Sequence, residues 1–161
     1  MKKNNILLGC VLIAFVLCVI CIIVTKINTP VEEEITNVDL SVLDININSQ
    51  TSFGEMTMQE IDKEILKNTF NIDEEKIEEV IGKTPLINVY ASTYVIVKVT
   101  ETNAEYVKEK FEEYGNLYEK QWENYLPEQF ELVKKRKIGI KGDYVYFIVS
   151  DSSDEIVNMI K

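Results

Sequence analysis

A continuous apolar segment near the N-terminus constrains this chain more than any other feature. Residues 6–24 contain no charged side chain and consist of aliphatic, aromatic and small residues. As an α-helix this segment would be roughly 28 Å long, at about 1.5 Å per residue. That length matches the hydrocarbon core of a bilayer, which is about 30 Å thick. The sequence therefore predicts one transmembrane helix over residues 6–24.

The charges that flank this segment predict its orientation. Lys2 and Lys3 precede it, and an acidic run at residues 32–34 follows it. Because positively charged flanks stay on the cytoplasmic side, we expect residues 1–5 to be cytoplasmic and the C-terminal domain to be extracellular. The chain is thus predicted to be a single-pass protein of the cell membrane.

Two kinds of N-terminal processing are alternatives to an intact signal anchor. A cleaved signal peptide would have a shorter apolar region and a small-x-small cleavage site, and residues 24–26 provide no such site. A lipoprotein signal would place a lipid on Cys10 after residues 7–9, but the apolar segment continues well beyond that cysteine. We favour the anchor, in which Cys10, Cys18 and Cys21 are small apolar residues of a membrane helix.

The composition after the apolar segment excludes several kinds of chemistry. All 27 acidic residues and all but three of the 17 basic residues follow residue 26, so this part of the chain is repelled by nucleic acid and by anionic lipid. It contains no histidine, and the three cysteines of the chain all lie within residues 6–24. Serine–histidine and cysteine–histidine catalysis, ordinary zinc sites and internal disulfides are therefore excluded. No motif selects a cofactor.

Residues 37–161, after a polar stalk at 25–36, have the length of one domain. Residues 37–50 suit either a strand or a helix. Capping patterns, turn residues and hydrophobic periodicity predict the remaining elements. These are helices that open at Thr57 and at Asp73, strands over 86–91 and 93–100, a long helix that opens at Thr102, strands over 131–140 and 143–150, and a last helix from Ser152.

The long helix carries a broad aromatic stripe. Its apolar residues recur every three or four positions, which is the spacing of one helix face. They are Val107, Phe111, Tyr114, Tyr118, Trp122 and Tyr125, and Pro127 ends the helix. We interpret the stripe as part of the core rather than as a carbohydrate or peptide groove. Trp122, near the helix end, is the member expected to reach the surface.

The order of these elements predicts the fold class. Tight turns such as the one at residues 142–143 make each pair of strands antiparallel. Residues 144–149 are apolar on both faces, which is typical of a central strand. We therefore expect an α+β fold, a two-layer sandwich of antiparallel sheet and helices, with the aromatic stripe packed on the sheet.

Two short motifs accompany this layout, Tyr-Leu-Pro at residues 125–127 and Gly-Asp-Tyr at residues 142–144. With an acidic helical start, two strand pairs and a long helix between them, residues 38–155 resemble the DUF4358-like domains of unknown function. These are uncharacterised extracytoplasmic domains of low-GC Gram-positive bacteria. The resemblance implies an N-terminal signal or anchor but no activity. Many members look like lipoproteins, and this chain departs from them at Cys10.

One basic cluster and one aromatic residue form a possible interaction surface: Lys134, Lys135, Arg136, Lys137 and Trp122. The cluster suits contact with an anionic polymer, a lipid headgroup or an acidic partner. It also suits an edge strand that is protected from aggregation by charge. We favour the second interpretation, because alternation along a strand would divide the four charges between two faces. Residues 151–155 are interpreted as a helix cap rather than a calcium loop.

These observations predict a non-enzymatic interaction or ligand-binding module, tethered to the membrane at the cell envelope, with an envelope protein or a ligand as its partner. No catalytic residue, metal ligand or cofactor site is selected, and nucleic acid is not expected as a partner. Two alternatives remain. One is a hydrolase that cleaves cell-wall glycan with two carboxylates. The other is an accessory subunit of a membrane complex.

Overall fold

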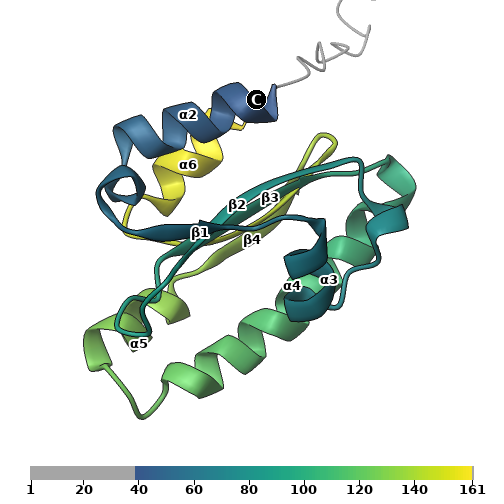
Figure 1. The fold of residues 1–161 in the computed structure, drawn as a ribbon. Coiled ribbons are helices and arrows are strands. Elements are labelled where there is room, and N and C mark those ends of the chain that lie inside the picture. Colours follow the sequence, from purple (N-terminus) through teal and green to yellow (C-terminus); the bar gives the residue numbers. More distant parts are fainter. Residues whose placement is uncertain (1–38, 161) are drawn as a thin grey trace, which may run out of the picture. The chain divides into compact units, whose positions relative to one another are not determined.

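A sheet of five antiparallel strands lies at the centre of the fold (Figure 1). The structure, a computed structural model, describes residues 39–160, so the predicted membrane helix and stalk lie outside the described residues. The strands are β1 (Met58–Glu60), β2 (Glu79–Pro85), β3 (Thr93–Lys98), β4 (Lys137–Lys141) and β5 (Tyr144–Val149). Their order across the sheet is β1-β2-β3-β5-β4, and every neighbouring pair is antiparallel.

Helices cover both faces of this sheet. They are α2 (Leu40–Gln50), α3 (Lys63–Phe70), α4 (Glu101–Trp122), α5 (Pro127–Lys134) and α6 (Ser153–Met159), with short 3₁₀ turns at Ser52–Glu55 and Glu74–Lys76. Figure 1 shows α2 and α6 on one side of the sheet and α3, α4 and α5 on the other. The predicted α+β class with an antiparallel sheet is confirmed. The predicted two-layer arrangement is wrong, because helices form a third layer.

The two inner strands explain why both faces need a cover. Along β3, Val95 and Val97 point into the cluster beneath α3 and α4, whereas Tyr94 and Ile96 point into the cluster beneath α2 and α6. Side chains alternate between the two faces of a strand, and β5 divides its apolar residues between the same two clusters. A strand that is apolar on both faces is stable only when both are covered.

Three predicted elements differ from the structure in the first half of the domain. Residues 58–60 form β1, and the helix predicted to open at Thr57 begins only after Asp62, whose carboxylate accepts a hydrogen bond from the Ile65 N–H at 2.8 Å. Residues 79–85 form β2 rather than a helix. Residues 86–92 form a loop, because Lys83 pairs with Tyr94 and the chain must reverse direction between them.

One further difference lies at Pro127, which begins a helix instead of only ending one. Proline fits the first turn of a helix because its fixed φ suits that turn and no N–H is needed there. Residues 127–134 accordingly form α5, and the strand predicted over 131–140 shortens to β4. The long helix α4 and the β4–β5 hairpin, with Gly142 at φ +57°, are confirmed. Among residues 39–160, no helix combines the length and the apolar character that a membrane span requires.

Candidate binding cleft

The four consecutive basic residues do not share one strand. Lys134 ends α5, Lys135 and Arg136 lie in the connection, and Lys137 begins β4. The prediction that they alternate along a strand is therefore wrong. Within the described residues, three of them pair with acids of different elements: Lys134 with Glu131 at 2.5 Å, Arg136 with Glu119 at 2.6 Å and Lys137 with Asp154 at 2.9 Å. These three positive charges are paired with acids on α5, α4 and α6 and do not form one basic patch.

Arg136 connects the start of β4 to the long helix. Its guanidinium donates to Glu119 Oε2 at 2.6 Å and to Asn116 Oδ1 at 3.2 Å, both on α4. Gly115 makes room for this side chain, since a Cβ there would lie 2.7 Å from the Arg136 Nε. Arg136 thus links the start of β4 to α4 and is not free to bind a partner through these contacts.

Trp122 is buried, with 4% of its surface exposed, so the expectation that it reaches the surface is wrong. The chain turns back directly after α4, where the Tyr125 N–H donates to the Trp122 carbonyl oxygen at 3.1 Å. The turn brings the two rings to a centroid distance of 5.5 Å. Position near a helix end did not expose this side chain, because the following residues cover it.

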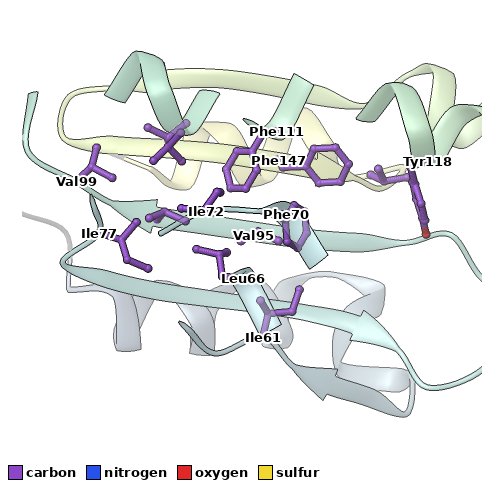
Figure 2. Packing of buried hydrophobic residues seen from close by; sticks show 14 of the residues in the cluster. Ile61, Leu66, Phe70, Ile72, Ile77, Val95, Val99, Phe111, Tyr118 and Phe147 are labelled. Carbon is purple, nitrogen blue, oxygen red and sulfur yellow. The ribbon is translucent and has the colours of Figure 1, made fainter. Parts of the chain in front are cut away.

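The aromatic stripe of α4 divides into two halves with different surroundings. In the first half, Phe111 is fully buried and contacts the rings of Phe70 at 5.5 Å and Phe147 at 5.9 Å. Figure 2 shows these three rings together in the middle of the core cluster, with Tyr118 at one end of it. The prediction that the stripe is core is confirmed for this half and also for Tyr118 and Trp122, which are buried in the same cluster. The second half borders a cleft.

This cleft, which we call the aromatic cleft, has a volume of about 560 Å³. The second half of α4 and the turn after it form one side. The end of β2 and the loop that follows it form the other. The residues that line the cleft are Thr84, Pro85, Ile87, Asn88, Tyr90, Tyr114, Tyr118, Lys120, Gln121, Trp122, Asn124 and Tyr125. Five of these twelve are aromatic.

The rings on the helix side form an unbroken row. Tyr114 and Tyr118 are stacked, with centroids 5.4 Å apart and planes inclined by 20°. Trp122 meets Tyr118 edge-on at 6.0 Å and is followed by Tyr125. Tyr118 and Trp122 are buried, whereas 55% of Tyr125 is exposed. On the loop side, 45% of Tyr90 is exposed. The cleft thus has a buried aromatic floor and an exposed tyrosine on each side.

Hydrogen bonding fixes the floor but leaves one donor unused. The Tyr118 hydroxyl donates to the Ala91 carbonyl oxygen at 3.1 Å and so joins α4 to the loop. Burial raises the pKa of Tyr118 to about 12 and also raises that of Tyr114 well above its usual range, so both phenols are neutral donors. The buried indole N–H of Trp122 acts on the Tyr118 hydroxyl and partly offsets this rise in pKa, yet among the described residues it has no acceptor that meets full hydrogen-bonding geometry. Buried donors of this kind are rare in folded proteins.

The electrostatic character of the cleft contrasts with that of the chain. The formal net charge of the chain is −10, yet the residues that line the cleft include no aspartate or glutamate, and Lys120 is their one charged member. The side chains of Asn88, Gln121 and Asn124 supply amide donors and acceptors at its rim. The cleft is chemically suited to an uncharged ligand with apolar faces and polar edges.

Sequence reasoning identified the helix side of this cleft but missed the loop side. The sequence favours core over groove for Tyr114, Tyr118, Trp122 and Tyr125, and it predicts a strand over residues 86–91. Proline at position 85 was the available signal for a strand end, because proline lacks the N–H that continues a ladder. Within residues 39–160, no group of three histidine, cysteine, aspartate or glutamate side chains is placed to hold a metal ion.

The fold and the cleft define an α+β domain with a five-stranded antiparallel sheet, helices on both faces and an aromatic cleft. The family model "Domain of unknown function (DUF4358)" matches residues 51–150. The chain therefore belongs to the DUF4358 family. The match includes the whole sheet and every residue that lines the cleft, whereas α2 and α6 lie outside it. Neither the curated proteins nor the solved structures gave a match.

Proposed function

We propose that this domain is a non-catalytic ligand-binding module and that the aromatic cleft is its binding site. The observation that carries the proposal is the combination of a buried aromatic floor, two exposed tyrosines and a lining without carboxylates. Its volume of about 560 Å³ falls in the range of ligand sites, roughly 300–1,000 Å³.

The loop beside the cleft supports the proposal. Between Pro85 and Ala91, four of the five residues are large and hydrophobic, and 44% to 56% of each is exposed: Leu86, Ile87, Val89 and Tyr90. The loop also borders a smaller hollow of about 380 Å³, lined by Val89 and residues 126–129. Exposed apolar side chains gathered in one place are typical of a surface that is covered when the protein acts.

We further propose that the apolar segment at residues 6–24 anchors this module in the cell membrane, with the domain outside the cytoplasm of a Gram-positive bacterium. The length of the segment, the lysines before it and the acidic residues after it support this orientation. A tethered module of this kind would hold an envelope ligand or an envelope protein close to the membrane surface.

The glycan-hydrolase alternative receives no support from this cleft. Glycosidases place two carboxyl groups on either side of the scissile bond, about 5–9.5 Å apart. The lining of the aromatic cleft includes neither aspartate nor glutamate.

Trp122 makes the proposal directly testable, because it is the only tryptophan of the chain and lies in the cleft. The full-length protein, kept free of sugar-headed detergents, would be titrated with three uncharged probes: small phenolic compounds, decaproline and a neutral tetrasaccharide. We expect at least one probe class to change the tryptophan emission saturably and Tyr125→Ala to weaken that change. If none of the three classes does so at millimolar concentration, the cleft is not a binding site and the proposal is wrong.

A further inference from the structure

We infer that the ligand of the aromatic cleft is an uncharged oligosaccharide. The inference rests on the proposed function and adds the chemical class of the ligand. A sugar ring has two kinds of surface, a face of C–H groups and a rim of hydroxyls. The cleft offers a matching group for each of them.

The exposed tyrosines match the C–H faces. Tyr90 and Tyr125 present 45% and 55% of their surface to solvent, and they lie on the loop side and on the helix side of the same cleft. Tyr125 is supported from behind by Trp122, whose ring centroid is 5.5 Å away. A flat aromatic ring held by a buried neighbour offers a large contact area at little cost in side-chain entropy.

The amide side chains match the hydroxyl rim. A carboxamide carries both donors and an acceptor, and a hydroxyl group is likewise both donor and acceptor. Within the described part of the chain, the side chains of Asn88, Gln121 and Asn124 are exposed and make no hydrogen bond. They are therefore available to a ligand without the loss of an existing contact.

Charge and hydrogen-bonding capacity argue against the other ligand classes. A cation would find no carboxylate among the cleft residues, and an anion would find only Lys120 there while approaching a chain of net charge −10. A proline-rich peptide fits aromatic grooves, but proline has no backbone N–H. Such a peptide would use the amide donors of the cleft, but its backbone would offer nothing to the three amide acceptors, which would remain bonded to water. A neutral sugar uses both.

The test compares two probes on the full-length protein. A tetrasaccharide of β-1,4-linked N-acetylglucosamine or glucose is titrated against Trp122 emission, with decaproline in a parallel series. We expect the sugar to bind saturably and Tyr125→Ala to weaken its binding about tenfold, as expected for the loss of one aromatic contact. Tyr125→Phe should keep most of the affinity, because it keeps the ring.

Leu117→Ala is the matched control, since Leu117 is an exposed hydrophobic residue of the same helix that does not line the cleft. It should leave sugar binding unchanged. Binding of decaproline alone, sensitive to Tyr125→Ala, would overturn the sugar inference while supporting a binding module. Binding of neither probe would overturn the sugar inference. An equal loss of sugar binding in Leu117→Ala would also overturn it, because the cleft would then not be the site.

Discussion

Tyr94 holds α2 against the sheet through a hydrogen-bond network that joins distant parts of the sequence. Its side chain is fully buried, and its hydroxyl donates to Asp44 Oδ1 at 2.5 Å. Asn48 Nδ2 donates to the same hydroxyl at 3.1 Å, and Lys83 Nζ donates to Asn48 Oδ1 at 3.0 Å. Burial, and then the Asp44 carboxylate, raise the pKa of Tyr94 far above its usual value. The phenol therefore remains a donor at every physiological pH.

Tyr94→Phe should lower the free energy of unfolding by about 1–3 kcal/mol, because it leaves a partly buried carboxylate and amide without their shared partner. Urea unfolding followed by circular dichroism would measure the change. Tyr146→Phe is the control: among the described residues the Tyr146 hydroxyl makes no hydrogen bond. The same substitution there should change stability by less than about 0.5 kcal/mol. Equal effects at the two positions would refute the role given to the network.

Tyr118 makes stability depend on pH in the alkaline range. Its pKa is about 12 in the folded protein, against 10.0 for a free tyrosine. Between these values the unfolded chain loses the phenolic proton while the folded chain keeps it, so the free energy of unfolding should fall as pH rises from 10 towards 12. Tyr118→Phe should reduce this slope, as measured by urea unfolding at several pH values. An unchanged slope in the variant would show that Tyr118 ionises normally.

At the level of elements, local signals predicted α4 and the β4–β5 hairpin because those segments carry long periodicity or a specific turn residue. They failed over residues 77–82. Ile77, Val80 and Ile81 have the spacing of a helix face, but they are also β-branched residues that suit a strand. Pairing with β3 decided between the two, and such long-range pairing is not visible in a window of ten residues.

Gly82 shows the same competition at one position, because a glycine directly after Ile77, Val80 and Ile81 is also typical of a helix end. It lies inside β2, opposite Val95, and a Cβ there would be 2.7 Å from the Tyr94 carbonyl oxygen and 3.2 Å from the Ile61 Cβ. Its role is to let three pieces of chain approach one another closely. This requirement depends on the assembled sheet, so the sequence alone does not reveal it.

Gly82→Ala should therefore destabilise the domain by about 1–3 kcal/mol, which is the usual effect of overpacking against neighbours that cannot move away. Thermal unfolding would measure it. Gln59→Ala, at an exposed position of the neighbouring strand β1, serves as the control and should change little. A fully stable Gly82→Ala protein would mean that the backbone at Tyr94 and the side chain of Ile61 can move away from residue 82 without loss, contrary to this close packing.

At the scale of the whole molecule, the sequence alone does not predict the aromatic cleft, because its two sides come from distant parts of the chain. Its helix side was visible as an aromatic stripe, but its loop side lies about thirty residues earlier in the chain and is brought there by the order of the strands. The apolar pattern of residues 144–149 indicates a strand that is covered on both faces, which is consistent with the third layer of helices. The sequence did not predict which element covers the second face of the sheet. Residues 40–50 suit a strand or a helix, and in the structure they form α2, which covers that face together with α6.

The proposed membrane topology can be tested by introducing one cysteine into the domain, because residues 25–161 contain none. Ser49 is exposed in the last turn of α2 and is suited to replacement. In intact cells that produce the Ser49→Cys protein, a membrane-impermeant maleimide should label the domain if the proposed orientation, with the lysines on the cytoplasmic side, is correct. The unaltered protein is the control, and its cysteines at positions 10, 18 and 21 should remain unlabelled inside the bilayer. Labelling of Ser49→Cys only after cell lysis would place the domain in the cytoplasm, and the envelope ligand proposed for the aromatic cleft would then be out of its reach.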